Sequence, residues 1–431
     1  MAWRRSLVVV VLLACLLPAS AAASLKMQIG AAEDEGRNSD PAVARAKMEL
    51  AKAAGFDAVR ITAIWAPGQS QVDREQLAAL QAAASAALFD HLEVTVTIMQ
   101  FGSRTTPLTP TARRQFASFA ADVVKRVPLI HGFIIGNEPN INRFWLPQFG
   151  PNGEDVAATA YEQLLAQTYD AIKAVDRKAV VIGGSVSPHG GDDPNAPRKT
   201  HSPTTFIRDL GAAYRASGRT KPIMDGFAFH PYGDNSSVGP TVAHPRSTSI
   251  GVADYDKLVA LLGEAFDGTA QLGSKMPIYY DEYGVESQIP RAKRKLYHGI
   301  EPATTKPVPL QTQADYYDEA LTMAACQPTV RALFLFHVTD ETDLNRWQSG
   351  VYYPDGTPKP TRAIVKQTIA QIRSGAVDCT QGPLIHENDG WVLVGTSARG
   401  PRSTHTRSKK PARKRHRPRS GPLSFLPLGI T

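Results

Sequence analysis

The segment His131-Gly-Phe-Ile-Ile-Gly-Asn-Glu-Pro139 contains a short continuous apolar run that ends in a polar tripeptide. Such a run is typical of a strand that is covered on both faces, as in a parallel sheet wrapped by helices. Similar runs recur along the chain. The eight predicted strands cover Lys26–Gly30, Ala58–Ala63, Glu93–Met99, Gly132–Gly136, Ala179–Gly183, Gly226–His230, Pro277–Tyr280 and Ala332–His337.

Helical patterns lie between the predicted strands. Asp40-Pro41 combines an N-cap residue with proline at the first helical position, and Thr109-Pro110 and Ser202-Pro203 repeat this signal. The other helical patterns cover Asp73–Leu88, Asp155–Val175, Ala253–Phe266, Gln311–Cys326 and Thr361–Ile372. The chain has 431 residues, of which 42% are hydrophobic. Eight strand–helix units in a chain of this length predict an α/β fold, a (β/α)8 TIM barrel.

A doubly wound open sheet is the alternative arrangement of such units. That fold usually binds nucleotides through a glycine-rich turn after its first strand. Here the first predicted strand leads into Gly30-Ala-Ala-Glu-Asp-Glu-Gly-Arg37, which has neither the GxGxxG nor the GxxxxGK[ST] spacing. The sequence therefore favours the barrel.

Three long segments follow predicted strands and interrupt the regular pattern. They cover Phe144–Asp155, Ser185–Thr200 and Ser287–Pro309. Loops that follow the strands of a barrel lie at its C-terminal end and usually shape the substrate site. We therefore expect substrate-binding groups in these loops.

The N-terminus is typical of a secretory signal peptide over residues 1–23. It has two arginines, an apolar stretch over residues 6–17 that is too short for a comfortable membrane span, and small residues before Ser24. A lipoprotein cleavage box at Cys15 is an alternative, which the apolar residues after that cysteine oppose. We expect a secreted, extracellular protein with no transmembrane segment in its mature chain.

The net charge of +8 is unevenly distributed. Residues 396–431 carry ten Lys or Arg and no acid, and the predicted signal peptide carries two arginines. Subtracting these charges leaves residues 24–395 with a net charge of −4. We divide the mature chain into a barrel (24–375), a short extension (376–395) and a basic tail (396–431) that is predicted to be disordered. The tail either has no specific partner or adheres to anionic cell-wall polymers or a membrane surface. Nucleic acid is not an expected partner of an exported protein.

The chain has three cysteines, and one of them belongs to the predicted signal peptide. The remaining pair is Cys326 and Cys379. In an oxidising compartment such a pair suggests one disulfide, with two free thiols as the alternative.

Two glutamates follow predicted strands that are far apart in the sequence. Glu138 follows the fourth apolar run, and Glu282 ends the seventh, Pro277-Ile-Tyr-Tyr-Asp-Glu-Tyr-Gly284. The C-terminal ends of barrel strands meet in one pocket, where one carboxyl group can protonate a glycosidic oxygen while another attacks the sugar carbon. A simple loop turn is the alternative for Asn137-Glu138-Pro139. This chemistry needs no cofactor, and no histidine spacing suggests a metal site.

These residues resemble the pattern of clan A glycoside hydrolases, the retaining (β/α)8-barrel glycosidases that include the cellulase family. The resemblance spans about Lys26 to Ile372. It implies that Glu138, after Asn137, is the acid/base and that Glu282, before Tyr283-Gly284, is the nucleophile. The implied activity is hydrolysis of β-linked O-glycosidic bonds in a poly- or oligosaccharide by double displacement.

Further positions match the clan A pattern. The segment Gly55-Phe-Asp-Ala-Val-Arg60 resembles the clan's second strand, and Phe229-His230-Pro-Tyr232-Gly233 resembles its sixth. The resemblance implies that Arg60 lies near the nucleophile, that Tyr232 contacts it and that His230 lines the pocket. Arg346-Trp347-x-x-Gly350 and the segment 355–360 also look clan-like.

Two positions depart from the family pattern. Gln100 follows the third strand where many members have a histidine, and the eighth run ends Phe334-Leu-Phe-His337 where many have a tryptophan. His337 is a candidate substrate contact at this strand end. Trp65, Trp145 and Trp347 are candidate sugar-stacking side chains by their loop positions, with core packing as the alternative.

Other functions remain open at the level of sequence. A transglycosylase would use the same glycosyl-enzyme ester as a hydrolase. A catalytically silent carbohydrate-binding barrel at the cell surface and a purely structural barrel are alternatives outside catalysis. The two glutamates together with Asn137 argue against both.

Overall fold

The computed structural model describes residues 24–379, 384–387 and 390–393. Its eight parallel strands form a closed barrel in chain order, and the pairing of the first strand with the eighth completes it. The strands are β1 (Gln28–Ala32), β2 (Ala58–Trp65), β3 (Glu93–Gln100), β4 (Gly132–Ile135), β5 (Val180–Val186), β6 (Gly226–Phe229), β7 (Ile278–Tyr283) and β8 (Val330–Phe336). The predicted barrel and all eight predicted strands are confirmed.

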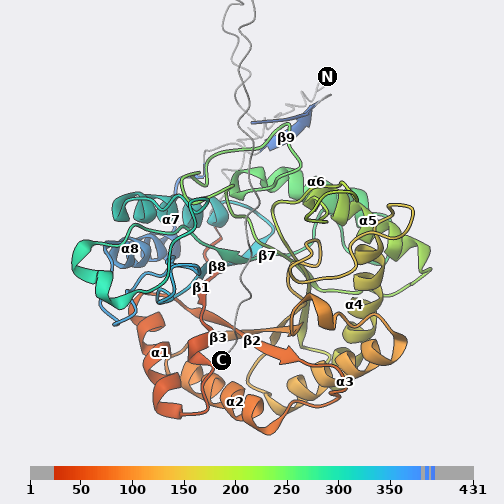
Figure 1. The fold of residues 1–431 in the computed structure, drawn as a ribbon, viewed down its shortest axis with the longest axis horizontal. Coiled ribbons are helices and arrows are strands. Elements are labelled where there is room, and N and C mark those ends of the chain that lie inside the picture. Colours follow the sequence, from red (N-terminus) through yellow and green to blue (C-terminus); the bar gives the residue numbers. More distant parts are fainter. Residues whose placement is uncertain (1–23, 380–383, 388–389, 394–431) are drawn as a thin grey trace, which may run out of the picture. The chain divides into compact units, whose positions relative to one another are not determined.

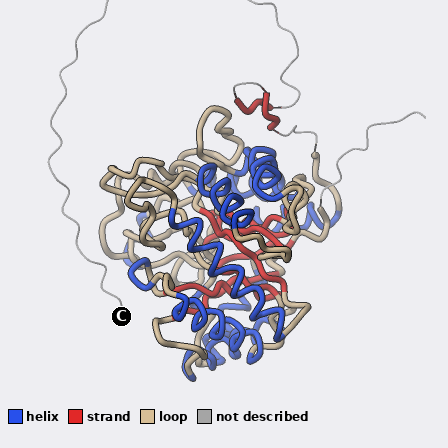
Figure 2. Tube along the Cα trace, turned by 90° about the vertical axis from the view of Figure 1, so that its right-hand side faces the viewer, coloured by secondary structure: helices blue, strands red, loops and turns tan. Residues whose placement is uncertain are grey.

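Eight α-helices alternate with the strands. They are α1 (Pro41–Ala53), α2 (Arg74–Phe89), α3 (Pro110–Arg126), α4 (Val156–Val175), α5 (Pro203–Ala216), α6 (Tyr255–Phe266), α7 (Leu310–Ala325) and α8 (Pro360–Ser374). Asp40, Thr109 and Ser202 cap their helices as predicted, since each side chain accepts a backbone N–H of the first turn. Figure 1 shows the helices around the strands, and Figure 2 shows the same layers from the side.

Smaller elements complete the described part of the chain. Four 3-10 helices lie in the loops: η1 (Asp34–Gly36), η2 (Ser103–Thr105), η3 (Val252–Asp254) and η4 (Arg291–Leu296). Beyond the barrel, β9 (Leu384–Glu387) and β10 (Gly390–Leu393) form an antiparallel pair. No helix within the described ranges has the length and apolar character needed to cross a membrane. The predicted signal peptide and basic tail lie outside the described residues.

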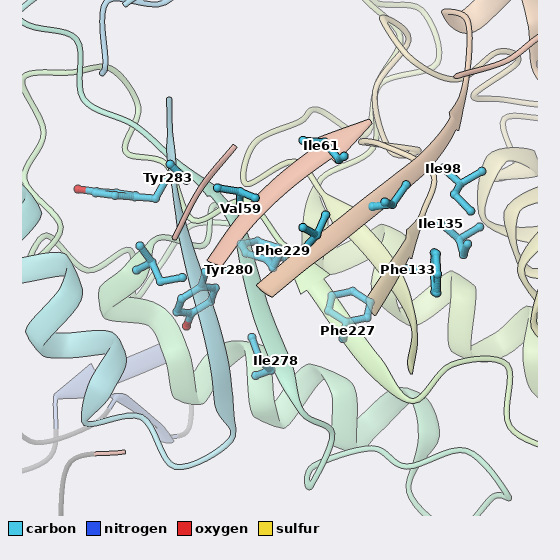
Figure 3. Packing of buried hydrophobic residues seen from close by; sticks show 14 of the residues in the cluster. Val59, Ile61, Ile98, Phe133, Ile135, Phe227, Phe229, Ile278, Tyr280 and Tyr283 are labelled. Carbon is cyan, nitrogen blue, oxygen red and sulfur yellow. The ribbon is translucent and has the colours of Figure 1, made fainter. Parts of the chain in front are cut away.

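Alternate residues of each strand have different surroundings. Val59, Ile61 and their equivalents on other strands belong to the large core cluster between strands and helices (Figure 3). Their neighbours face the barrel interior, where Ile134, Ile182 and Ala228 pack together. Arg60 continues this interior face toward the C-terminal strand ends. The interior is therefore apolar at its base and charged at the end where the loops after the strands begin.

Cys326 and Cys379 form the predicted disulfide, with an S–S distance of 2.03 Å. Cys326 directly follows α7 and precedes β8, and Cys379 lies a few residues beyond α8. The bond therefore attaches the C-terminal extension to the barrel end where β8 starts, which is the end opposite the carboxyl termini of the strands.

Tyr161 of α4 supports the ends of two neighbouring strands. Its buried hydroxyl donates to the carbonyl oxygen of Ile135 at 2.6 Å and accepts from the backbone N–H of Gly184 at 2.8 Å. Gly136 faces the ring at positive φ, and a Cβ there would lie 3.0 Å from the Tyr161 ring. This side chain therefore fixes the backbone immediately before Glu138.

We predict that Tyr161→Phe destabilises the fold by about 1–3 kcal/mol, because it leaves the buried N–H of Gly184 without its acceptor. Urea unfolding followed by circular dichroism measures this change. Tyr214→Phe is the matched control, since that ring is also buried but its hydroxyl donates to the Lys221 carbonyl oxygen at 2.9 Å and accepts no backbone N–H within the described residues. Equal unfolding midpoints for Tyr161→Phe and the unaltered chain would contradict the proposed support.

Candidate active site

The two glutamates predicted from strand ends meet at one histidine nitrogen. Glu138 Oε1 lies 3.0 Å from Nδ1 of His230, and Glu282 Oε2 lies 3.5 Å from the same atom. The sum of these two distances is the upper limit on the separation of the two carboxylate oxygens. Both carboxyl groups are therefore close enough to act on one glycosidic bond.

Glu138 is held in an unusual backbone conformation. Its φ is +40°, in the left-handed region that costs a non-glycine residue about 1–3 kcal/mol. The Glu138 N–H donates to the carbonyl oxygen of Ser185 at 2.8 Å. Just after it, the buried Asn140 side chain bonds the backbones of Ser187 and His201. The loop after β4 is thus fastened to the loop after β5, and this attachment maintains the strained conformation.

A β-bulge directs two consecutive acids of β7 into the barrel. Tyr280 pairs with Leu333 and Tyr283 with Leu335, so three steps on β7 correspond to two on β8. A regular strand would place Asp281 and Glu282 on opposite faces, whereas a bulge re-aims one of them. The extra residue therefore allows both carboxylates to face the same cluster.

Glu282 is the carboxylate of this pair that a substrate can reach. Its side chain is 13% exposed, and that of Asp281 is 0% exposed. Arg60 donates to Oε1 of Glu282, and the Tyr232 hydroxyl donates to Oε2 at 3.1 Å. Both donors hold the carboxylate in place, so the predicted positions of Arg60 and Tyr232 relative to Glu282 agree with the geometry.

Asp281 is a wholly buried anion at the centre of the cluster. It accepts from the Ser185 hydroxyl at 2.8 Å and lies 3.3 Å from His230 Nε2 and 3.4 Å from Arg60 Nη1. Burial alone would raise the pKa of Asp281, but His230, Arg60 and the Ser185 hydroxyl outweigh it and lower this pKa. The carboxylate therefore stays ionised.

Ser185, His230 and Asp281 do not form a nucleophilic triad. The serine hydroxyl donates to the aspartate rather than to the histidine, and all three residues are buried. Ser185 itself has a φ of +50° and is the extra residue of a second bulge, between the pairs Gly184–Ala228 and Val186–Phe229. Its role is to link the buried acid to the histidine.

His230 bridges the buried and exposed parts of the cluster as a cation. Burial alone would lower the pKa of His230, but Glu282, Asp281 and Glu138 outweigh it and raise this pKa well above 6.5. The imidazolium can donate from Nδ1 to Glu138 and from Nε2 to the Ser185 oxygen at 3.0 Å. The cluster thus contains three carboxyl groups and two cations, and one added proton makes it neutral.

The three candidate tryptophans have different environments. Trp65 is wholly buried against Phe116 and donates its indole N–H to the Gln69 carbonyl oxygen, so its prediction as a substrate contact is wrong. Trp145 is also buried, against Tyr161. Trp347 is partly exposed, and its ring lies 5.1 Å from Tyr232. Only the last of these three can present a face to a sugar.

Two other predicted contacts lie at strand ends. His337 follows β8 directly, with Nδ1 3.2 Å from the Ala32 carbonyl oxygen and Nε2 3.7 Å from Glu341. Its ring lies beside Phe336, which in turn contacts Trp347 at 5.3 Å. Asn137 is 7% exposed, and its side-chain amide makes no hydrogen bond with the described residues. These side chains border the cluster, and the amide of Asn137 is available to a ligand.

A second buried polar cluster joins the β7–α7 and β8–α8 loops and was not foreseen from sequence. Lys359, with no exposed surface, binds Asp340 at 2.7 Å, Ser287 Oγ at 2.9 Å and the Gln348 carbonyl oxygen at 3.0 Å. Glu286 lies beside it and accepts from the Gln348 N–H at 3.5 Å. The only sequence signal was the clan-like segment 355–360 that contains the lysine. Within the described residues, no group of three His, Cys, Asp or Glu side chains could hold a metal ion.

We predict that Asp281→Asn lowers the pKa of His230, because one of the carboxylates that offset its burial is lost. A raised histidine pKa contributes stability that is fully present below the unfolded value of about 6.5 and is lost as pH rises through the folded value. In the variant, this contribution to the free energy of unfolding should therefore be lost at a lower pH than in the unaltered chain. NMR titration of the His230 ring measures the pKa, with Asp170→Asn on the surface as control. An unchanged His230 titration in Asp281→Asn would contradict the assignment.

A second pH dependence follows from Glu286. Burial raises the pKa of Glu286 from its ordinary value of 4.5 to about 8. Its contribution to stability is therefore full below pH 4.5 and is lost as pH rises through 8. We predict that Glu286→Gln removes this loss, so that the stability of the variant relative to the unaltered chain rises between these pH values and is constant above them. Unfolding midpoints across pH test this, and exposed Glu264→Gln should show no such trend.

Solved structures with the same fold include several glycoside hydrolases. A family 39 glycoside hydrolase from the gut symbiont Bacteroides cellulosilyticus WH2 aligns with a TM-score of 0.56 and 17% identity over 86% of this chain and 68% of its own. GH5_18 proteins from Streptomyces cattleya, in complex with Manb1-4GlcNAc, and from Bifidobacterium longum subsp. infantis align with TM-scores of 0.54 and 0.51. Their identities are 15% and 14%, over 81% and 80% of this chain and 81% and 79% of theirs. No protein-family model matches the sequence, and no curated protein does. The chain thus has the barrel fold of these glycoside hydrolases.

Proposed function

We propose that this protein is a secreted retaining glycoside hydrolase that cleaves β-linked O-glycosidic bonds by double displacement. The observation that carries the proposal is the pair of carboxylates that share His230 Nδ1, at 3.0 Å for Glu138 and 3.5 Å for Glu282. The barrel fold of known glycoside hydrolases supports it.

In the first step Glu282 attacks the anomeric carbon of the sugar, and the bond from that carbon to the leaving oxygen breaks. Glu138 transfers its proton to the leaving oxygen. The products are a glycosyl ester on Glu282 and a carboxylate on Glu138. Arg60 and Tyr232 hold the attacking carboxylate, one donor on each oxygen.

In the second step the Glu138 carboxylate takes a proton from a water molecule, whose oxygen attacks the anomeric carbon. The ester bond to Glu282 breaks, and the sugar leaves with retained configuration. The imidazolium of His230 remains close to both carboxylates, so it can offset the negative charge that moves from one to the other. At an effective dielectric of 20, one such contact at about 4 Å contributes roughly 4 kcal/mol.

The sugar face of the site is built around Trp347. This indole contacts Tyr232 and Phe336, so a loop residue supplies an aromatic surface next to the end of β8. Sugars stack on such faces through their C–H groups, and we infer that Trp347 is the platform. Because one structural neighbour binds Manb1-4GlcNAc, β-mannosides belong in the first substrate panel.

Export and surface adhesion are parts of the same proposal. The basic N-terminal start with its apolar stretch supports export, and the disulfide between Cys326 and Cys379 fits an oxidising compartment. The ten cations of residues 396–431 would then meet anionic cell-wall polymers.

We predict that Glu282→Ala abolishes turnover of aryl β-glycosides and that Glu138→Ala lowers it by about 10²–10⁴-fold. The loss in Glu138→Ala should be much smaller with a dinitrophenyl leaving group, which needs no proton, than with a phenyl group. Initial rates over a panel of β-glucosides, β-mannosides and β-xylosides measure both effects. Proton NMR of the first sugar released should show the β-anomer.

Glu264→Gln, on the outer surface of α6, is the control that keeps full activity. Release of the α-anomer first would replace the retaining mechanism by an inverting one. Absence of turnover with intact binding of sugars would favour a silent carbohydrate-binding barrel.

A further inference from the structure

The β7–α7 loop, residues 284–309, carries a concentrated positive charge. Its 3-10 helix η4 reads Arg291-Ala-Lys-Arg-Lys-Leu296, and Lys306 adds a fifth cation. The acids of this loop are Glu286 and Glu301, and burial raises the pKa of each. The loop is therefore strongly positive in a mature chain whose residues 24–395 carry a net negative charge.

The loop is fixed to its neighbour at several points. The Tyr297 hydroxyl donates to Asp340 at 2.6 Å, Lys293 binds Asp355 at 2.8 Å, and the His298 N–H donates to the Thr342 carbonyl oxygen at 2.9 Å. The buried ammonium of Lys359 also holds Ser287 at the start of the loop. The backbone that carries the cations of η4 is thus held in place by contacts with the β8–α8 loop.

Three of these cations have no partner in the described protein. Arg291, Arg294 and Lys295 are exposed, and their side chains make no ion pair or hydrogen bond with the described residues. Lys293 between them is the one that is neutralised, by Asp355. Three unpaired like charges within five residues create a local positive potential that attracts anions. We call Arg291, Arg294 and Lys295 the basic surface.

A cavity of about 390 Å³ opens beside the basic surface. Arg294 forms part of its wall together with the polar side chains of Gln288 and Glu301 and the apolar ones of Ile289 and Leu344. This volume is within the range of ligand pockets, which starts at roughly 300 Å³. The cavity therefore combines the guanidinium of Arg294 with an amide, apolar groups and the Glu301 carboxyl, whose raised pKa favours its neutral form and so lessens its repulsion of an acidic sugar unit.

The β8–α8 loop contributes residues both to the cavity wall and to the candidate active site. Leu344 in the cavity wall and Trp347 belong to the same β8–α8 segment, and Trp347 packs on Tyr232, which binds Glu282. The cavity residues and the two glutamates therefore all lie at strand ends or in loops at the same, C-terminal end of the barrel.

We propose that the basic surface and its cavity bind anionic groups of an acidic polysaccharide, which is the substrate of this protein. This inference rests on the proposed glycosidase function and adds the substrate class. A carboxylate or a sulfate ester on the sugar would supply the charge, since the guanidinium of Arg294 pairs with either anion.

The test compares two triple variants in the full-length chain with Glu282→Ala added, so that polymers are bound but not cut. One carries Arg291→Ala, Arg294→Ala and Lys295→Ala. The matched control carries Lys125→Ala, Arg177→Ala and Lys178→Ala, three exposed cations at the opposite end of the barrel. The C-terminal tail is the same in all, so its contribution cancels. Affinity electrophoresis measures binding to carboxymethylated β-glucan, sulfated β-glucan and neutral β-glucan, which share one β-linked backbone.

We expect loss of the basic surface to weaken binding of at least one acidic polymer by about tenfold or more at low salt. Added salt should reduce this difference, because it screens exposed charges. Neutral β-glucan should bind all variants equally. Preference for carboxymethylated β-glucan would identify a carboxylate, and preference for sulfated β-glucan a sulfate ester. Equal binding of both acidic polymers by the two triple variants would overturn the proposal.

Activity separates this proposal from the proposed function. With Glu282 intact, loss of the basic surface should leave the turnover of a small neutral aryl glycoside unchanged and raise the KM for the acidic polymer. If no variant turns over any glycoside while acidic binding still depends on the basic surface, the glycosidase proposal fails. The surface would then be a binding site only, and its assignment to a substrate is overturned.

Discussion

The candidate site depends on the charge balance around His230. Its two ring nitrogens face Glu138 and Glu282 on one side and Ser185 and Asp281 on the other, all within 3.5 Å. Burying one charge without a partner costs several kcal/mol, and removing one member of a buried pair typically costs about 3–5 kcal/mol. Removal of any one charge would therefore leave another charge of the cluster buried without its partner. The two partly exposed carboxylates are thus held in place by the buried charges of His230, Arg60 and Asp281.

Two one-residue insertions into the sheet make this cluster possible. The bulge in β7 turns Asp281 and Glu282 toward the same interior, and the bulge in β5 brings Ser185 to the buried acid. Each of these two bulges lies at the C-terminal end of its strand, although β7 also shifts its register between Ile278 and Tyr279 at its start. The strand pairing is thus irregular where the proposed chemistry would occur. Regular packing of the helices around the rest of the barrel maintains this irregular backbone.

The sequence was sufficient to predict the barrel, its eight strands, three helix caps, the disulfide and the meeting of two glutamates at the strand ends. These features depend on local apolar runs and on residues at strand ends. The bulges and the Lys359 cluster depend on which strand or loop lies opposite, so no local pattern contains them. The interpretation of Trp65 failed for a reason visible in the sequence. It continues the odd-numbered series of Val59 and Ile61, and this alternation places its side chain among the helices.

The disulfide has a consequence for the orientation of the molecule. It fixes Cys379 at the end of the barrel where β8 begins, whereas Glu138 and Glu282 lie where strands end. A strand such as β8, with seven residues, is roughly 20 Å long, so these two levels lie at opposite ends of the barrel. Any force that the chain transmits through Cys379 therefore reaches the barrel at this base. Reduction of this bond would release Cys379 from the end of α7, at the level of the barrel remote from Glu138 and Glu282.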